Sequence, residues 1–219
     1  MEYMARPVKP NSGVAERNPK RTRERILSAA LKEFAAKGFA GARVDAIARR
    51  AAINKRMLYH YFGNKERLFR EVLHRKIAER QASAEGLSGD PAESLPFWFK
   101  LSCKDADWVR LLEWEALQEA DNQLIDGAGR RALAMRALGR IRQQQASGHL
   151  SGEFEPRHLL LAMRSLTMFP LAFPQLTRFI TGQPVSDPHF QKKYAEFLKN
   201  FAAAFRPATG RRNKTNFEN

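Results

Sequence analysis

Residues 43–68 read RVDAIARRAAINKRMLYHYFGNKERL, and this stretch decides the fold. A short helix with one apolar face is predicted by residues at i, i+3, i+4 and i+7, namely Val44, Ile47, Ala48 and Ala51. A tight turn over 51–54 follows, and a further helix begins after it. Two short helices joined in this way are typical of a helix-turn-helix, whose second helix enters the major groove of DNA.

The second of these helices divides into an apolar side and a polar side. Leu58 and Phe62 are four residues apart and are expected to face the core. The side chains left for the outside suit phosphates and base edges, and they are Lys55, Arg56, Met57, Tyr59 and His60. Alternative interpretations stay open for three residues: Asn54 as a helix cap, Tyr59 as a packing residue and His60 as a solvated side chain.

The rest of the chain is also helical in pattern. Ile26, Ala30 and Phe34 indicate a first helix, with Thr22 as its expected N-cap and Gly38 as its end. After a fourth helix capped by Asn64, apolar periodic segments follow at 92–103, 106–118, 122–147, 159–173 and 190–205. Pro170 and Pro174 are expected to kink or break the penultimate segment. Alternating strand patterns are absent from the sequence, so we predict an all-α fold of about nine helices.

Charge is distributed unevenly along the 219 residues, whose net charge is +15. Residues 1–80 hold 20 Lys and Arg against 8 Asp and Glu, whereas residues 81–219 hold 18 against 15. A basic excess at one end is typical of a protein that binds a polyanion, although solubility alone is the simpler explanation. The 43% of hydrophobic residues indicates a globular chain.

Residues 25–68 resemble the DNA-binding domain of the TetR family of bacterial regulators. The blocks that carry this resemblance occur in the family's order and spacing, and they are RILSAA at 25–30, VDAIA at 44–48 and LYHYFGNKERL at 58–68. The chain departs from the family at Ala52, where Gly is usual, and at Arg43, where Ser or Thr is usual. Both departures concern detailed contacts rather than the fold.

The resemblance implies a division of the chain and several residue roles. Residues 1–20 are expected to be a flexible basic arm, 21–67 the helix-turn-helix domain, 68–206 an effector-binding and dimerisation domain, and 207–219 a flexible tail. Tyr61 and Lys65 would contact phosphates, Lys65 from the first turn of a helix whose free N–H groups also favour anions. Arg43 would reach a phosphate in place of capping its helix.

The second domain is expected to bind an unidentified small-molecule effector and to form a homodimer. Pockets are usually built from adaptable apolar residues, and the candidates for the effector pocket are Phe97, Trp98, Trp108, Trp114, Met135, Met163 and Phe169. Ordinary core packing is the alternative for each. The segment 159–173 and the five aromatic residues at 190, 194, 197, 201 and 205 predict a four-helix interface between two copies.

We therefore expect a ligand-responsive regulator, a repressor more readily than an activator, that binds a palindromic operator as a homodimer and is released by an aromatic, nucleobase-like or lipid-like effector. No cofactor, metal or membrane partner is expected. A single cysteine, Cys103, and the absence of an apolar run of about 18 residues favour the cytoplasm.

Two other functions are alternatives to regulation. An enzyme would need more than Cys103 with His149 or His158, or Glu66, Glu71 and His74 at a metal, because no supporting motif accompanies these residues. An architectural protein that binds DNA without sequence preference, or a partner-binding adaptor, is compatible with the basic arm and the charge. Non-specific DNA binding differs from operator binding in its response to competitor DNA.

Overall fold

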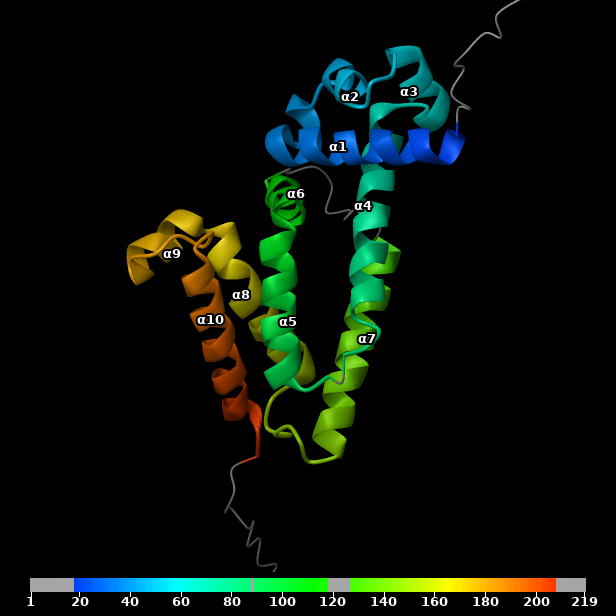
Figure 1. The fold of residues 1–219 in the computed structure, drawn as a ribbon. Helices are drawn as coiled ribbons and strands as arrows, with labels where there is room; N and C mark the ends of the chain where they lie inside the picture. The colour runs from blue at the N-terminus through cyan, green and yellow to red at the C-terminus, as the bar shows by residue number, and fades with distance from the viewer. Residues whose placement is uncertain (1–17, 88, 118–126, 208–219) are drawn as a thin grey trace, which may run out of the picture.

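The computed structural model describes residues 18–87, 89–117 and 127–207, and in these ranges the chain is helical, without a strand. The helices in chain order are α1 (Pro19–Gly41), α2 (Val44–Arg50), α3 (Lys55–Phe62), α4 (Lys65–Ser83), α5 (Pro91–Lys104), α6 (Ala106–Ala116), α7 (Gly127–Ala146), α8 (Pro156–Ala172), α9 (Pro174–Thr181), α10 (Pro188–Phe201) and the 3-10 helix η1 (Ala202–Phe205). The all-α prediction is confirmed. The described residues contain ten α-helices rather than about nine (Figure 1).

The first helix begins earlier than its expected cap. Asn18, not Thr22, is the N-cap of α1, and its side chain accepts hydrogen bonds from the backbone N–H groups of Lys20 and Arg21 at 3.1 and 3.2 Å. Pro19 is preorganised for the position that follows the cap, so α1 includes residues 19 and 20, which were expected to belong to the arm. Residues 1–17 of that arm, and residues 208–219 of the expected tail, lie outside the described residues.

The additional helix results from a break between α8 and α9. Pro170 lies inside α8, and the chain turns only at Phe173, directly before Pro174. Pro174 has no backbone N–H to continue a helical ladder, and the residue before a proline is disfavoured in helical conformation, which explains the position of the break. Together α8 and α9 have the length and composition of a membrane span but are bent by 91°, and no single helix in the described residues has both.

One hydrophobic core holds the N-terminal helices and part of the C-terminal bundle together. Its largest fully buried residues are Phe34 from α1, Leu58 from α3, and Leu68 and Leu73 from α4. The same core includes Trp108 and Leu111 of α6, which lies against α1. α4 runs from this core to the side of α7, so that one continuous helix connects α3 with the bundle (Figure 1).

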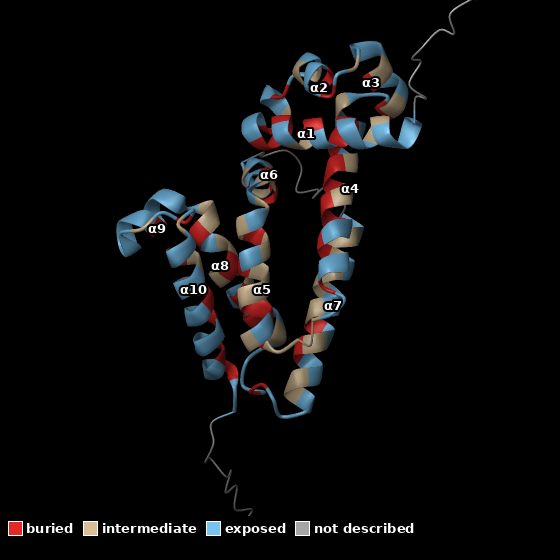
Figure 2. Cartoon of the chain, in the orientation of Figure 1, coloured by how far each residue is buried: buried red, intermediate tan, exposed pale blue. Residues whose placement is uncertain are grey.

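A second core lies between α5, α8 and α10. Phe99 of α5 is fully buried, and its ring lies 4.8 Å from that of Tyr194 on α10. The Tyr194 hydroxyl donates to the carbonyl of Leu166 on α8 at 2.9 Å, which satisfies its polar end. In Figure 2 the buried residues of α10 face α5, while α9 and the outer side of α10 are exposed.

Candidate functional site

The helix α3 is fixed from beneath by its apolar residues and from its start by a cap. Leu58 and Phe62 are buried in the first core, as predicted. The Asn54 side chain accepts a hydrogen bond from the backbone N–H of Met57 at 2.7 Å. The capping interpretation of Asn54 is therefore confirmed, and α3 is presented as a rigid element at the end of the molecule.

The turn between α2 and α3 places Ala52 in a left-handed conformation, with φ at +49°. This conformation is disfavoured for residues that have a Cβ, which explains why glycine is usual here in the family that the segment resembles. The Arg25 guanidinium of α1 donates to the carbonyl of Ala51, and to that of Ala52 at 3.1 Å. This side chain therefore connects the turn to α1.

The outer face of α3 is open to solvent. Arg56 and His60 are exposed, Tyr59 is 39% exposed, and Met57 is half-buried. Lys55 is exposed as well but lies 3.1 Å from Asp45 of α2, and this hydrogen bond raises the pKa of Lys55. Tyr59 thus faces outwards rather than packing under the domain.

The three residues predicted to contact phosphates lie directly before α2, in α3 and at the first position of α4. The side chain of Arg43 is exposed and makes no capping hydrogen bond at the start of α2. Tyr61 is half-buried against the first core. The Lys65 ammonium lies 3.3 Å from the Ala40 carbonyl and 4.8 Å from the centre of the Phe39 ring, and partial burial lowers its pKa.

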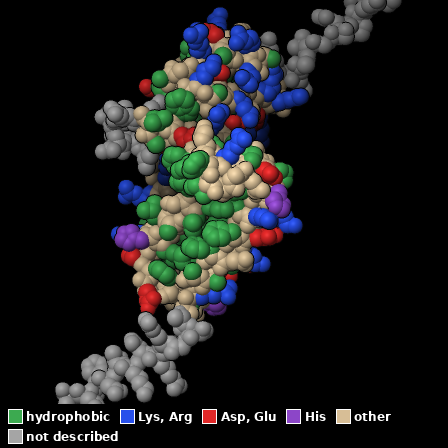
Figure 3. All heavy atoms as spheres, turned by 90° about the vertical axis from the view of Figure 1, so that its left-hand side faces the viewer, with side chains coloured by type: hydrophobic (Ala, Val, Ile, Leu, Met, Phe, Trp, Pro, Cys, Tyr) green, Lys and Arg blue, Asp and Glu red, His purple; other side chains and the backbone are tan. Residues whose placement is uncertain are grey.

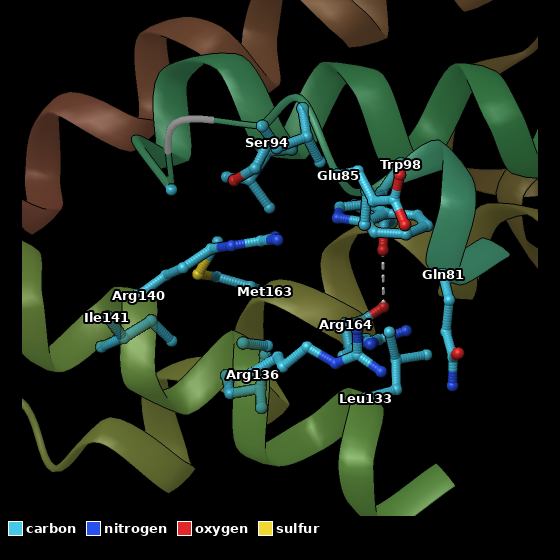
Figure 4. Close-up of a pocket in the computed structure, with 17 residues that line it drawn as sticks. Gln81, Glu85, Ser94, Trp98, Leu133, Arg136, Arg140, Ile141, Met163 and Arg164 are labelled. Carbon is cyan, nitrogen blue, oxygen red and sulfur yellow. Dashed lines mark hydrogen bonds between the residues drawn. The ribbon is translucent and has the colours of Figure 1, made fainter. Parts of the chain in front are cut away.

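A cavity opens between α4, α5, α7 and α8 and has a volume of about 770 Å³, counted to its open mouth. Leu95, Trp98 and Met163 form part of its apolar wall. Figure 4 shows Arg136 and Arg140 extending from α7 into the space bordered by Ser94 and Trp98.

A second cavity of about 930 Å³, also open to solvent, lies between α4, α6, α7 and α8. It shares Leu133, Leu160 and Arg164 with the first, so the two are adjacent. Trp108 borders the second cavity, and the guanidinium of Arg80 lies 5.4 Å from the centre of its ring.

The predicted effector residues are thus only partly brought together. Trp98 and Met163 line the first cavity, and Trp108 lines the second. Four residues border neither cavity, namely Phe97, Trp114, Met135 and Phe169. Apolar side chains on a helix can also serve packing or association, and sequence spacing does not separate these roles.

Each of those four residues has another place in the structure. Phe97 packs edge-on against Trp98, with ring centres 5.3 Å apart. Met135 is 54% exposed on α7, and Phe169 is 42% exposed beside Phe173. Trp114 donates from its indole nitrogen to the Ala35 carbonyl at 3.2 Å and therefore links α6 to α1.

The arginines of the two cavities were not predicted. Six arginines border one cavity or the other, namely Arg80, Arg130, Arg136, Arg140, Arg157 and Arg164. Of these side chains, Arg80 is only 3% exposed. The only sequence signal was the presence of Arg164 in an otherwise apolar segment.

Exposed apolar residues gather on the face formed by α9, α10 and the end of α8. Figure 3 shows this apolar surface below the basic end of the molecule. Its members are Phe169, Phe173, Leu176, Phe179, Ile180, Phe197 and Phe201, with Phe179 87% exposed. Of the five aromatic residues predicted for an interface, Phe190, Tyr194 and Phe205 instead pack inside the protomer.

The residues considered as catalytic candidates, such as Cys103 and His149, do not form a catalytic site. Burial raises the pKa of the Cys103 thiol to about 11, so the thiolate needed for nucleophilic attack is scarce at neutral pH. The imidazole of His149 instead shares a hydrogen bond with the Ser147 hydroxyl at 2.8 Å. Within the described ranges, no three His, Cys, Asp or Glu residues gather closely enough to hold a metal ion.

Two sequence profiles match the chain in consecutive regions. The profile of bacterial regulatory proteins of the tetR family matches residues 26–72. The profile of the tetracyclin repressor-like C-terminal domain matches residues 98–199. Together they include the helix-turn-helix and most of the bundle.

Whole-chain relatives agree with these matches. The HTH-type transcriptional repressor SCO4008 of Streptomyces coelicolor is 31% identical over 77% of this chain and 88% of its own length. The repressor NicS of Pseudomonas putida is 32% identical over 72% of this chain and 79% of its own. The crystal structure of the putative regulator SCO4942 of S. coelicolor superposes with a TM-score of 0.72 at 27% identity, over 85% of this chain and 98% of that one.

Proposed function

We propose, from the premise that this chain belongs to the TetR family of bacterial transcriptional regulators, that it is a repressor that binds a palindromic operator as a homodimer and is released by a small-molecule effector. The operator is chromosomal DNA, so the protein acts in the cytoplasm. The domain division proposed is residues 21–67 for DNA and 68–206 for effector and partner.

The observation that carries the proposal is the exposed polar face of α3. Arg56, Tyr59 and His60 project from a helix that is capped at Asn54 and buried on its other side. Arg43 before α2, Tyr61 in α3 and Lys65 at the start of α4 are the phosphate contacts proposed beside it. A rigid helix with base-reading side chains at its centre and backbone contacts at its rim is the arrangement that major-groove recognition requires.

Association of two copies is supported by the apolar face of α8, α9 and α10. Side chains as exposed as Phe179 and Ile180, at 87% and 67%, leave apolar surface in water, which is unfavourable for a free protomer. An isologous contact through this face would relate two α3 helices by a two-fold axis. Two recognition helices at roughly 34 Å spacing would then enter successive major grooves.

Release by an effector is supported by the path of α4. Its first turn follows α3 directly, and its last turns border both cavities. Lys76 of α4 lies 2.8 Å from Asp105, which precedes α6. A ligand that favours a different position of α4 relative to α6 would change the spacing of the two α3 helices, to the extent of its differential affinity for the two states.

The test is a footprint of the purified protein on the DNA that flanks its own gene, with excess random competitor DNA. We expect one protected palindrome that persists in competitor. Protection that disappears with competitor and moderate salt would contradict operator recognition and favour sequence-independent binding.

A further inference from the structure

Arg164 is a half-buried cation that forms no ion pair among the described residues. It lies on the wall shared by the two cavities, and no described residue forms an ion pair or a side-chain hydrogen bond with it. Its guanidinium lies 5.5 Å from the centre of the Trp98 ring. Burial lowers its pKa.

Arg80 presents a second buried cation to the second cavity. Its Nη2 donates to the Ser102 hydroxyl at 3.2 Å, while its Nη1 is buried with no hydrogen-bond partner. The nearest carboxylate oxygen, on Asp105, is 3.8 Å away and also lies 2.8 Å from Lys76. Burial and the charge of Arg164 lower the pKa of Arg80 to about 10, so Arg80 remains charged at neutral pH.

The described residues that line the second cavity include no acidic side chain, whereas Glu85 lines the first cavity. The second cavity is lined by four arginines, with Trp108 and aliphatic side chains for the rest. Arg130 pairs with Glu115 at 2.7 Å, outside the lining, and its Nε and Nη2 have no partner. Buried guanidinium groups are normally paired with carboxylates, often through two parallel hydrogen bonds. The Nη1 of Arg80, which is 3.8 Å from Asp105 without a hydrogen bond, and the guanidinium of Arg164 are therefore available to an anion that enters with the ligand.

We propose that the effector is an organic acid with an apolar body, whose carboxylate binds Arg80 and Arg164 while the body occupies the second cavity. The proposal rests on the proposed effector-responsive function and names the ligand's chemical class. Planar acids suit the site because Trp98 and Trp108 border the two arginines. The carboxylate would share Arg80 with Asp105, and so would act on the contact between α4 and α6.

The first test needs no ligand. Met has a volume close to that of Arg but no charge, so Arg164→Met removes the repulsion from Arg80 and retains the packing. We expect the thermal midpoint of the free protein to rise by roughly 3 °C, because an unpaired buried charge destabilises the fold. The control is Arg142→Met, an exposed arginine on α7, which should leave the midpoint unchanged. A lower midpoint for Arg164→Met would overturn the proposal by making Arg164 a structural residue.

The second test compares acids with their uncharged amides. Benzoate, phenylacetate and indole-3-acetate, each beside its primary amide, are titrated at millimolar concentration into the full-length protein, and the thermal midpoint and tryptophan fluorescence are recorded. We expect acids alone to raise the midpoint, and Arg164→Met to lose that rise.

Equal effects of acid and amide, or no effect of any acid, would overturn the anionic class. Footprinting the same samples without ligand keeps this result separate from operator binding: protection with no acid effect defeats only the ligand proposal, whereas loss of protection defeats the proposed function.

Discussion

The basic side chains of α3 and those of the bundle cavities carry the same charge in opposite surroundings. Arg56 is exposed on α3, whereas Arg80 is 3% exposed and lies between Trp98 and Trp108. A solvated cation binds a polyanion through many weak, salt-sensitive contacts. A desolvated cation whose hydrogen bonds are incomplete, as at Nη1 of Arg80, instead favours one small anion strongly. One chain thus has two anion-binding regions of different selectivity.

The two regions are connected by α4 and by the contact of α6 with α1. Trp114 of α6 covers Gly38, where α1 turns with φ at +67°. The ammonium of Lys32 on α1 also lies 2.6 Å from a carboxylate oxygen of Asp107 on α6. A change at the cavity that moves α4 or α6 would therefore also move α1 and the first hydrophobic core, against which α3 packs.

The largest predicted effect comes from breaking this connection with Gly38→Ala. The new Cβ would lie 2.8 Å from the Trp114 ring, at a φ that residues with a Cβ rarely adopt. We expect the free energy of unfolding to fall by about 2–3 kcal/mol, measured by denaturant titration. Gly41→Ala is the matched control, since its Cβ would meet only Lys37 at 3.4 Å. Equal effects of the two substitutions would show that Trp114 does not constrain α1.

A smaller effect, on operator affinity, is expected for substitutions at Arg56 and Lys65. Arg56→Ala removes an exposed guanidinium from the first turn of α3, and we expect operator affinity to fall by about 1–3 kcal/mol together with sequence preference. Lys65→Gln should weaken binding to all sequences and reduce the salt slope by about 1. Both are measured by titration of labelled duplexes at several salt concentrations. A reversed pattern would exchange the roles of the two residues.

The smallest effect concerns the turn that orients α3. Ala52→Gly relieves the left-handed conformation at φ +49°, and we expect the free energy of unfolding to rise by about 0.5–1 kcal/mol. Ala51→Gly, at a helical φ of −77°, should instead lower it. Thermal unfolding distinguishes the two, and destabilisation by Ala52→Gly would contradict the strain at this turn.

The two regions also differ in how far the sequence predicted them. The cap at Asn54 and the buried pair Leu58 and Phe62 were predictable because a local period and a local hydrogen bond determine them. The roles of Trp114 and Phe169 were not, because contact with α1 and exposure on the α8–α10 face depend on tertiary packing. The places of Arg80 and Arg164 at the cavities were not predicted, because a basic residue on a helix is normally solvated. Only the folded bundle shows that they are partly or fully buried.

The most direct test of the account is a linkage measurement with one acid that binds the cavity. Operator affinity is measured with and without saturating acid, and acid affinity is measured with and without operator duplex. If acid binding at the arginines is coupled to the position of α3, the acid weakens operator binding and the operator weakens acid binding by the same factor, roughly 5- to 150-fold. Acid binding that leaves operator affinity unchanged would contradict the account, because the two anion-binding regions would then be independent.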